Sequence, residues 1–216
     1  MNFAHLLARR AMASLEPSMT PFVIAICGWA DTGKSTLAGN LCQELRASGC
    51  DADRISTDAF LLDRETRNSL GITGYNPASL DASEMLKAIS NLSCGGAYEY
   101  YPYDNRTGKR SAQMVRIDSL RVVVVEGIHA LHVDLLPRLH FKVFIDAEAD
   151  VLAELRIQAN MRKRGMGAEE AIRRVARELE DFKKFTAPAK QFADWVASVS
   201  RGYEYSIGTT EPAIQC

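Results

Sequence analysis

The chain has few of the residues that build disulfide frameworks or metal sites. Its five cysteines are odd in number and form no CxxC pair, and its four histidines form no HExxH motif. His129 and His132 lie three positions apart, a spacing that alone arises more often by chance than in a metal site. This cysteine usage is typical of reduced thiols, so we expect a cytoplasmic protein without a disulfide framework or a zinc site.

Long apolar runs and an excess of either charge are also missing. No stretch approaches the roughly 20 apolar residues that a transmembrane helix needs, and the longest clean run covers residues 22–27. Lys and Arg number 26 against 27 Asp and Glu, which gives a net charge of -1. A protein that coats nucleic acid would be strongly basic. The composition therefore predicts no membrane and no nucleic acid as a partner.

The first 20 residues carry two arginines, Arg9 and Arg10, but their apolar stretch is short and precedes the arginines. That order argues against a secretory signal. We expect a helical extension over 1–20 that covers the domain behind it, with an organellar presequence as the alternative. A chain of 216 residues, 47% of them hydrophobic, is long enough for a buried core, which predicts one domain over 21–216.

Strand and helix patterns alternate along the chain. Continuous Val and Ile runs are typical of strands covered on both faces, and leucines recur at one-turn spacing in the first helix after them. The predicted strands cover 22–27, 52–57, 120–125, 141–145 and 193–199; the predicted helices cover 34–48, 82–93, 148–163 and 168–185. Residues 61–80 look irregular, and 97–112 look like an arm or hairpin. The pattern predicts a three-layer α/β fold, with a parallel sheet flanked by helices.

A glycine-rich loop stands between the first strand and the first helix after it. Residues 28–35 read GWADTGKS, which fits the phosphate-binding pattern GxxxxGKS in the required strand–loop–helix context. Backbone N–H groups of such a loop bind phosphate oxygens, Lys34 should reach the β- and γ-phosphates, and Ser35 should bind Mg²⁺. A chance glycine turn is the alternative. The expected nucleotide-binding residues are Gly28, Ala30, Asp31, Thr32, Gly33, Lys34, Ser35 and Thr36.

Motifs that would assign the triphosphate to a switch or a transporter are missing. The chain has no NKxD and no DxxG after a later strand, which argues against a GTPase switch. The sequence LSCGG at 92–96 differs from the LSGGQ signature of transport ATPases and is better interpreted as a helix end followed by glycines. Transfer of phosphate to a small molecule is therefore favoured.

Three carboxylates stand at positions where such chemistry needs them. Glu126 ends a valine strand, where phosphate-loop enzymes hold Mg²⁺, and Asp58 follows the second strand, where it could accept a proton from an attacking hydroxyl. Turn-forming acids are the alternative for both. Asp81 begins the sequence DASE, which favours a helix cap over a ligand on the residues alone.

An ordered set of motifs resembles the uridine kinase and phosphoribulokinase group of phosphate-loop kinases, which includes bacterial pantothenate kinase. The resemblance spans about residues 22–197 and rests on GWADTGKS, STDAF, NPASLD, YPYDNRTGKR, VVVVEGIHAL, FKVFIDA and FTAPAKQFADWV. It implies an ATP- and Mg²⁺-dependent kinase that phosphorylates a hydroxyl of a small molecule, with a substrate arm at about 61–112 and a lid at about 154–168.

The resemblance also implies roles for single residues. Asp58 matches the catalytic base, Asp81 a residue that binds substrate hydroxyls, and Tyr103 an aromatic residue of the substrate arm. Glu126 matches the carboxylate that ends the magnesium-binding strand, and the stretch 156–164 matches the lid. We expect the lid residues Arg162 and Arg164 to stabilise the transferring phosphate, since cationic groups there offset the transition-state charge.

The tyrosine-rich segment around Tyr103 and Arg110 allows three interpretations. Aromatic and basic residues together suit single-stranded nucleic acid, a substrate arm, or a plain β-hairpin. Because the whole chain is near neutral, we favour the substrate arm, with Arg110 as a further substrate-binding residue.

The sequence departs from the family pattern in the segments that are expected to bind the acceptor. Ala159 and Asn160 replace an Arg-Asp pair of the lid, Tyr75-Asn76-Pro77 replaces Phe-Asp-x-Pro, and Pro102 directly precedes the arm tyrosine. The acceptor expected first is a nucleoside. Alternatives are pantothenate, a sugar or sugar acid, or nicotinamide riboside; a nucleotide-binding regulatory protein without turnover, and a homo-oligomer, also stay open.

Overall fold

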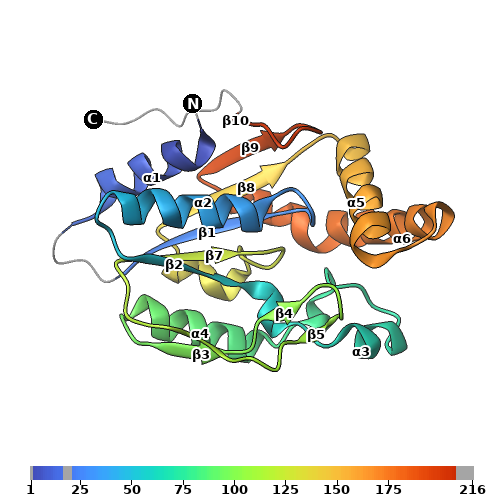
Figure 1. The fold of residues 1–216 in the computed structure, drawn as a ribbon, viewed down its shortest axis with the longest axis horizontal. Helices are drawn as coiled ribbons and strands as arrows, with labels where there is room; N and C mark the ends of the chain where they lie inside the picture. Colours follow the sequence, from blue (N-terminus) through green and yellow to red (C-terminus); the bar gives the residue numbers. More distant parts are fainter. Residues whose placement is uncertain (1, 17–20, 208–216) are drawn as a thin grey trace.

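A six-stranded sheet forms the centre of the computed structural model, which describes residues 2–16 and 21–207 (Figure 1). Its strand order is β10-β9-β8-β1-β7-β2. The strands are β1 (Phe22–Gly28), β2 (Ala52–Ser56), β7 (Val122–Glu126), β8 (Phe141–Asp146), β9 (Trp195–Val199) and β10 (Tyr205–Ile207). All neighbours pair in parallel except the edge strand β10, which is antiparallel to β9. The predicted α/β fold with a parallel sheet is thereby confirmed.

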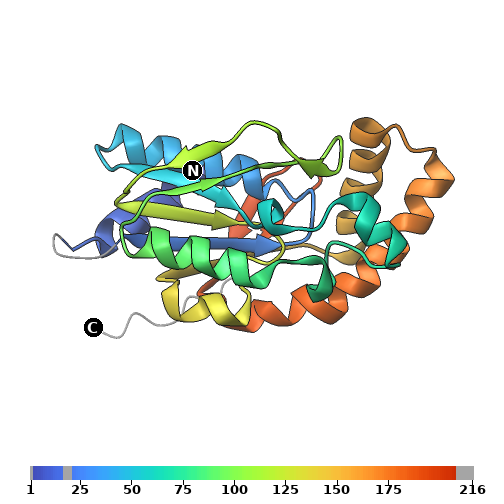
Figure 2. The same ribbon diagram turned by 90° about the horizontal axis from the view of Figure 1, so that it is seen from below.

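Helices cover both faces of this sheet. On one face, α1 (Phe3–Ser14) and α2 (Lys34–Ala47) pack over Ile24 and Ile26 of β1. On the other, α4 (Ala82–Ser93) packs over Val23 and Ala25 of the same strand, and Figure 2 shows it lying across that face. Successive residues of a strand point to opposite faces, so one fully buried strand contributes to two hydrophobic clusters. This explains the uninterrupted apolar runs of β1 and β7.

The remaining elements gather at one end of the sheet or run along its edge. Two helices form the lid region at the right of Figure 1, α5 (Ala149–Arg164) and α6 (Ala168–Asp181). Two small antiparallel pairs form the arm, β3 (Tyr98–Tyr100) with β6 (Val115–Ile117) and β4 (Tyr103–Asp104) with β5 (Lys109–Arg110). The short helices are α3 (Arg64–Ser69), η1 (Thr57–Phe60), η2 (Pro77–Ser79), η3 (Val133–Arg138), the π-turn η4 (Phe182–Thr186) and η5 (Ala187–Phe192).

Several local features differ from the sequence expectation. The segment 61–80 contains a helix, α3, and the helix expected over 168–185 changes to a π-turn after Asp181, where Phe182 is buried. Strand β10 was not predicted. The arm is one antiparallel hairpin that is interrupted at Pro102, between the pair β3–β6 and the nested pair β4–β5; proline has no N–H to donate to a ladder.

The N-terminal helix α1 packs on α2. Of the extension expected over 1–20, residues 1 and 17–20 lie outside the described part, as does the end of the chain at 208–216. Among the described residues, no helix is long and apolar enough to cross a membrane.

Candidate active site

Three neighbouring strands of the sheet end at one cleft of about 1150 Å³. The phosphate loop, residues 28–35, follows β1; Glu126 ends β7; and Asp58 lies in η1 directly after β2. Register explains the convergence, because Ile26 pairs with Glu126, which pairs with Ser56. We call this space the main cleft; ligands of open α/β sheets bind at such an edge, outside the carboxyl ends of the strands.

The phosphate loop adopts a backbone that needs its two glycines. Gly28 has φ +139°, and a Cβ there would lie 2.1 Å from the carbonyl oxygen of Ile145 on β8. Gly33 has φ +82° and is the N-cap of α2, so no Cβ strain opposes the left-handed turn. The N–H groups at the start of α2 thereby face the main cleft, where a helix N-terminus favours an anion.

The base of the main cleft holds a lysine, a hydroxyl and a carboxylate. Ser35 Oγ donates a hydrogen bond to Glu126 Oε1 at 3.1 Å, and Lys34 Nζ donates to the carbonyl oxygen of Trp29. Burial raises the pKa of Glu126, with Asp58 adding to that rise. Burial also lowers the pKa of Lys34, against the opposing pull of Glu126. A bound cation and a phosphate would supply the charges that these two buried groups lack.

Asp58 lies where an acceptor could meet the nucleotide. It is half-buried, lines the main cleft, and is close enough to Lys34 and Glu126 to affect their pKa values. The Asp58 backbone N–H donates to Ser56 Oγ at 3.3 Å, which fixes the start of η1. From the arm, Asn105 Nδ2 donates to Asp58 Oδ2 at 3.5 Å. The carboxylate is thus held between the sheet edge and the arm.

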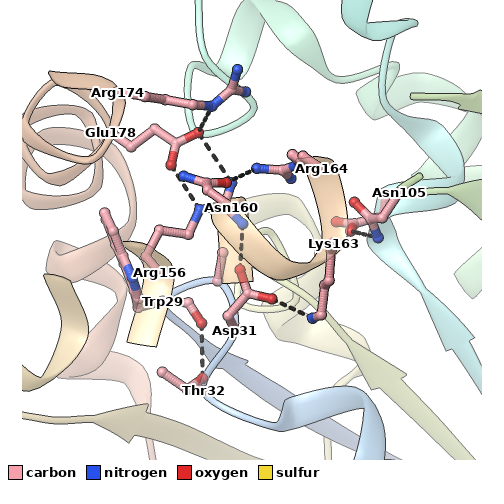
Figure 3. A network of polar contacts seen from close by, with 12 residues as sticks. Trp29, Asp31, Thr32, Asn105, Arg156, Asn160, Lys163, Arg164, Arg174 and Glu178 are labelled. Atoms are coloured by element: carbon pink, nitrogen blue, oxygen red, sulfur yellow. Dashed lines mark hydrogen bonds and ion pairs between the residues drawn. The ribbon is translucent and has the colours of Figure 1, made fainter. Parts of the chain in front are cut away.

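A buried ion-pair network joins the phosphate loop to the lid (Figure 3). Arg156 of α5 donates from Nε and Nη2 to the carboxylate of Glu178 on α6, at 2.7 and 3.0 Å, and from Nη1 to Asp31. Lys163 Nζ lies 2.6 Å from Asp31 Oδ1, and Arg174 Nε lies 2.9 Å from Glu178 Oε1. Burial alone would raise the pKa of Asp31, but Arg156 and Lys163 lower it to about 2. The network therefore carries fixed charges at neutral pH.

A cluster of aromatic side chains packs against the phosphate loop. The rings of Trp29 and Tyr75 stack with centroids 4.9 Å apart, and Phe182 lies edge-on to Trp29 at 4.9 Å. Tyr75 Oη accepts a hydrogen bond from the Ala30 N–H at 3.0 Å, and Thr32 Oγ1 donates to the Trp29 carbonyl at 2.8 Å. The sequence singled out Tyr75 only as a departure from a motif; its contact with the loop has no signal in the local pattern.

The N-terminal helix and the last hairpin close one end of the main cleft. Tyr205 Oη donates to the Thr32 carbonyl at 2.8 Å, and the rings of Phe3 and Tyr205 stack at 5.4 Å. Phe3, Tyr203 and Tyr205 all line the main cleft. Sequence reasoning missed these three residues because they lie outside every motif and far from the loop in the chain.

The structure brings most, but not all, of the expected site residues together. The main cleft is lined by Ala30, Asp31, Gly33, Lys34, Ser35, Thr36, Asp58, Glu126, Arg162 and Arg164. Gly28 and Thr32 support the loop instead: Gly28 lies against Ile145 of β8, and Thr32 Oγ1 donates to the Trp29 carbonyl.

Three expected substrate residues do not line the main cleft. Asp81 is exposed and caps α4, accepting a hydrogen bond from the Glu84 N–H at 2.9 Å. Tyr103 Oη donates to the Gly108 carbonyl at 2.8 Å within the arm, and Arg110 is exposed opposite Tyr103 in the ladder. A local hydrogen bond thus occupies Asp81 and Tyr103 in this structure, and their substrate role stays a prediction.

Comparison with known proteins agrees with this architecture. The model of the phosphoribulokinase / uridine kinase family matches residues 23–204. The chain belongs to this family. The membership that the ordered motifs indicated is confirmed, and so is a kinase as the class of enzyme.

Similar proteins carry several kinase names. A uridine kinase of Pectobacterium carotovorum is 29% identical over 187 residues, which cover 83% of this chain and 87% of that protein. A chloroplastic uridine/cytidine kinase of Arabidopsis thaliana is 26% identical over 199 residues; the match covers 86% of this chain but only 40% of that protein. The solved structure of a D-glycerate 3-kinase from Cryptococcus neoformans superposes with a TM-score of 0.68 at 16% identity, covering 95% and 96% of the two chains, which shows a shared fold.

Proposed function

We propose that this protein transfers the γ-phosphate of ATP to a hydroxyl group of a small molecule. The observation that carries the proposal is the position of Asp58 in the main cleft, opposite Lys34 and Glu126. A phosphate loop alone would fit any nucleotide-binding protein. A carboxylate placed to accept the proton of an attacking hydroxyl is what a kinase adds.

The residues of the main cleft fit Mg-ATP. Ser35 and Glu126 would hold Mg²⁺, whose role when bound is to neutralise charge on the β- and γ-phosphates. Among residues 2–16 and 21–207, no group of three or more His, Cys, Asp or Glu side chains could hold a metal alone. One hydroxyl and one carboxylate, from Ser35 and Glu126, suit Mg²⁺, which is commonly held by one or two carboxylates together with substrate phosphates.

Each remaining residue then has a defined task in the transfer. Asp58 accepts the proton as the acceptor oxygen forms its bond to the γ-phosphorus, and the bond from that phosphorus to ADP breaks. Lys34, Arg162 and Arg164 offset the charge on the transferring group. Closure of the lid over the main cleft would exclude water, the competing acceptor.

A nucleoside is one candidate acceptor, since a relative with 29% identity is named a uridine kinase. The alternatives are pantothenate, a sugar or sugar acid, and nicotinamide riboside. A cytoplasmic location and a homo-oligomer also stay predictions.

Substitution Asp58→Asn tests the proposal against ADP release with a panel of these acceptors. Asp53→Asn is the matched control, because Asp53 lies on β2, just before Asp58 in the chain, but is half-buried, pairs with Arg46 and does not line the main cleft. We expect Asp58→Asn to lower acceptor-dependent turnover by about 10²–10⁴-fold while ATP affinity persists. Turnover within a few-fold of wild type would show that Asp58 is not the base. Tight ATP binding with no acceptor-dependent ADP release would favour the nucleotide-binding regulatory protein.

A further inference from the structure

A second, smaller pocket opens beside Asp58 on the side of α3 and the arm. Its volume is about 60 Å³, and five arginines but only two carboxylates line it. Asp58 lines both this pocket and the main cleft. We name it the arginine pocket, after Arg64, Arg67, Arg156, Arg164 and Arg174.

We infer that the acceptor carries an anionic group, a carboxylate or a phosphate, which binds in the arginine pocket while its hydroxyl meets Asp58. The inference rests on the proposed phosphotransfer and names the class of acceptor that it uses. The anion is expected to contact Arg64, Arg67 and Arg164.

These three arginines differ from their neighbours in lacking a counter-charge. Arg156 and Arg174 share Glu178, and Arg156 also pairs with Asp31. Within the described part of the chain, Arg64, Arg67 and Arg164 have no carboxylate within 4.0 Å. Glu178 is already shared, and Asp58 is the proposed base. The pocket thus holds an excess of positive charge in a chain whose net charge is -1.

The unpaired guanidinium groups are held in place by neutral acceptors. Arg67 is 8% exposed; its Nε donates to the Leu62 carbonyl at 3.0 Å and its Nη2 to Tyr103 Oη at 2.5 Å. Arg64 donates from Nη1 to the Arg106 carbonyl at 3.3 Å and from Nη2 to the Asn105 carbonyl. Both side chains are therefore positioned before a ligand arrives, which lowers the entropy cost of binding.

Electrostatics within the pocket favour an anionic ligand. Burial, together with Arg156 and Arg174, lowers the pKa of Arg164 to about 10, and burial lowers the pKa of Arg64. Burial is the larger cause of both shifts, and the neighbouring arginines add to it, so the surroundings disfavour each positive charge. A carboxylate or phosphate would remove that repulsion, and a planar guanidinium group can bind either through two parallel hydrogen bonds.

The size of the arginine pocket also favours a small anionic group. The volume of about 60 Å³ is small beside the about 1150 Å³ of the main cleft, which suits a small charged group. A neutral ring in this place would leave the buried Arg67 and the half-buried Arg64 and Arg164 without a counter-charge, and unpaired polar groups are how a site rejects the wrong ligand.

Binding of simple anions tests the inference without knowledge of the acceptor. The nucleotide site is first saturated with Mg²⁺ and a non-hydrolysable ATP analogue, so that the phosphate loop takes up no added anion. Inorganic phosphate and D-glycerate are then titrated at constant ionic strength, and the melting temperature is recorded. We expect stabilisation in wild type, its loss in Arg64→Gln/Arg67→Gln, and its persistence in Arg177→Gln, an exposed arginine on α6. Because Arg67 is buried, Arg64→Gln alone serves as the second variant.

Kinetics with matched acceptors then separate the carboxylate from the phosphate. D-glycerate is compared with glycerol, and ribulose 5-phosphate with ribulose, with uridine as a neutral nucleoside. We expect kcat/KM for the preferred charged acceptor to exceed that for its neutral partner more than 100-fold. Arg64→Gln should raise the KM for the charged acceptor about 10- to 100-fold, the value of a hydrogen bond to a charged group, and leave the KM for ATP unchanged.

The two proposals fail in different ways. Efficient turnover of a neutral acceptor, unaffected by Arg64→Gln, would overturn the anionic acceptor and leave the kinase intact. Absence of anion-dependent stabilisation in wild type would also overturn it. Anion binding in the arginine pocket without any acceptor-dependent ADP release would instead count against the proposed phosphotransfer.

Discussion

Substitution Arg156→Met should destabilise this protein far more than the loss of a surface ion pair would. Arg156 is 8% exposed and Glu178 is 3% exposed, so the network between the phosphate loop and the lid is buried. Methionine keeps the apolar stem of the side chain and removes the charge. Two carboxylates, Asp31 and Glu178, then lose their shared partner.

The magnitude follows from what remains around those carboxylates. Removing one partner of a buried ion pair costs about 3–5 kcal/mol, because the other charge stays buried and uncompensated. Here Lys163 still contacts Asp31, and Arg174 still contacts Glu178. We therefore expect the lower end of the range, a loss of about 3 kcal/mol in the free energy of unfolding. At about 2–4 °C for each kcal/mol, the melting temperature should fall by about 6–12 °C.

Urea denaturation without nucleotide measures this loss, with the exposed Arg177→Met as control. Adding Glu178→Gln to Arg156→Met should recover part of the loss, because it removes a buried carboxylate that only Arg174 would still compensate. Residues of one network give non-additive effects. A loss below about 1 kcal/mol, the size of an exposed ion pair, or strict additivity in the double variant would show that these residues do not form a coupled, buried network.

Three further predictions concern the main cleft. Asp31→Asn should lower the free energy of unfolding by about 2 kcal/mol at pH 7. The pKa of Asp31 is lowered to about 2 in the folded protein, so the charged carboxylate stabilises the fold at pH values above the pKa that it has in the unfolded chain. In denaturation experiments from pH 7 to pH 2, the difference from wild type should therefore vanish as the pH falls below 4. Glu126→Gln should raise the melting temperature of the nucleotide-free protein, because its raised pKa means that the charged form is disfavoured, and should abolish Mg²⁺-dependent turnover; an unchanged or lower melting temperature would contradict this. Phe3→Leu, which removes the stacking on Tyr205, should weaken ATP binding by about 2- to 10-fold in calorimetry, whereas Phe192→Leu should not.

Much of the fold was predictable because strong local signals coincide with tertiary structure. Both β1 and β7 are buried on both faces, so their apolar runs needed no alternation to be recognised. By contrast, β10 has only three residues after a polar turn and is stabilised by its pairing with β9, which no local pattern records. The π-turn after α6 depends likewise on the packing of Phe182 against Trp29.

The candidate site likewise contains residues that a local motif predicts and residues that only tertiary contacts bring together. Motif spacing placed Lys34, Ser35, Asp58 and Glu126 at one sheet edge, and the structure brings them into one cleft. The arginine pocket escaped prediction because Arg64 lies in a segment that looked irregular, and its neighbours come from α5 and α6, about 90 residues or more further along the chain. Contacts of that sequence separation follow from topology, which a single sequence does not reveal residue by residue.

Transfer of the γ-phosphate itself distinguishes a kinase from a protein that only binds nucleotide. ATP radiolabelled at the γ-phosphate would be incubated with the protein, Mg²⁺ and each acceptor in turn, and the products separated. We expect label on an organic acceptor, lost in Asp58→Asn and retained in Asp53→Asn. Label that remains in ATP with every acceptor, or that appears only as inorganic phosphate, would contradict it.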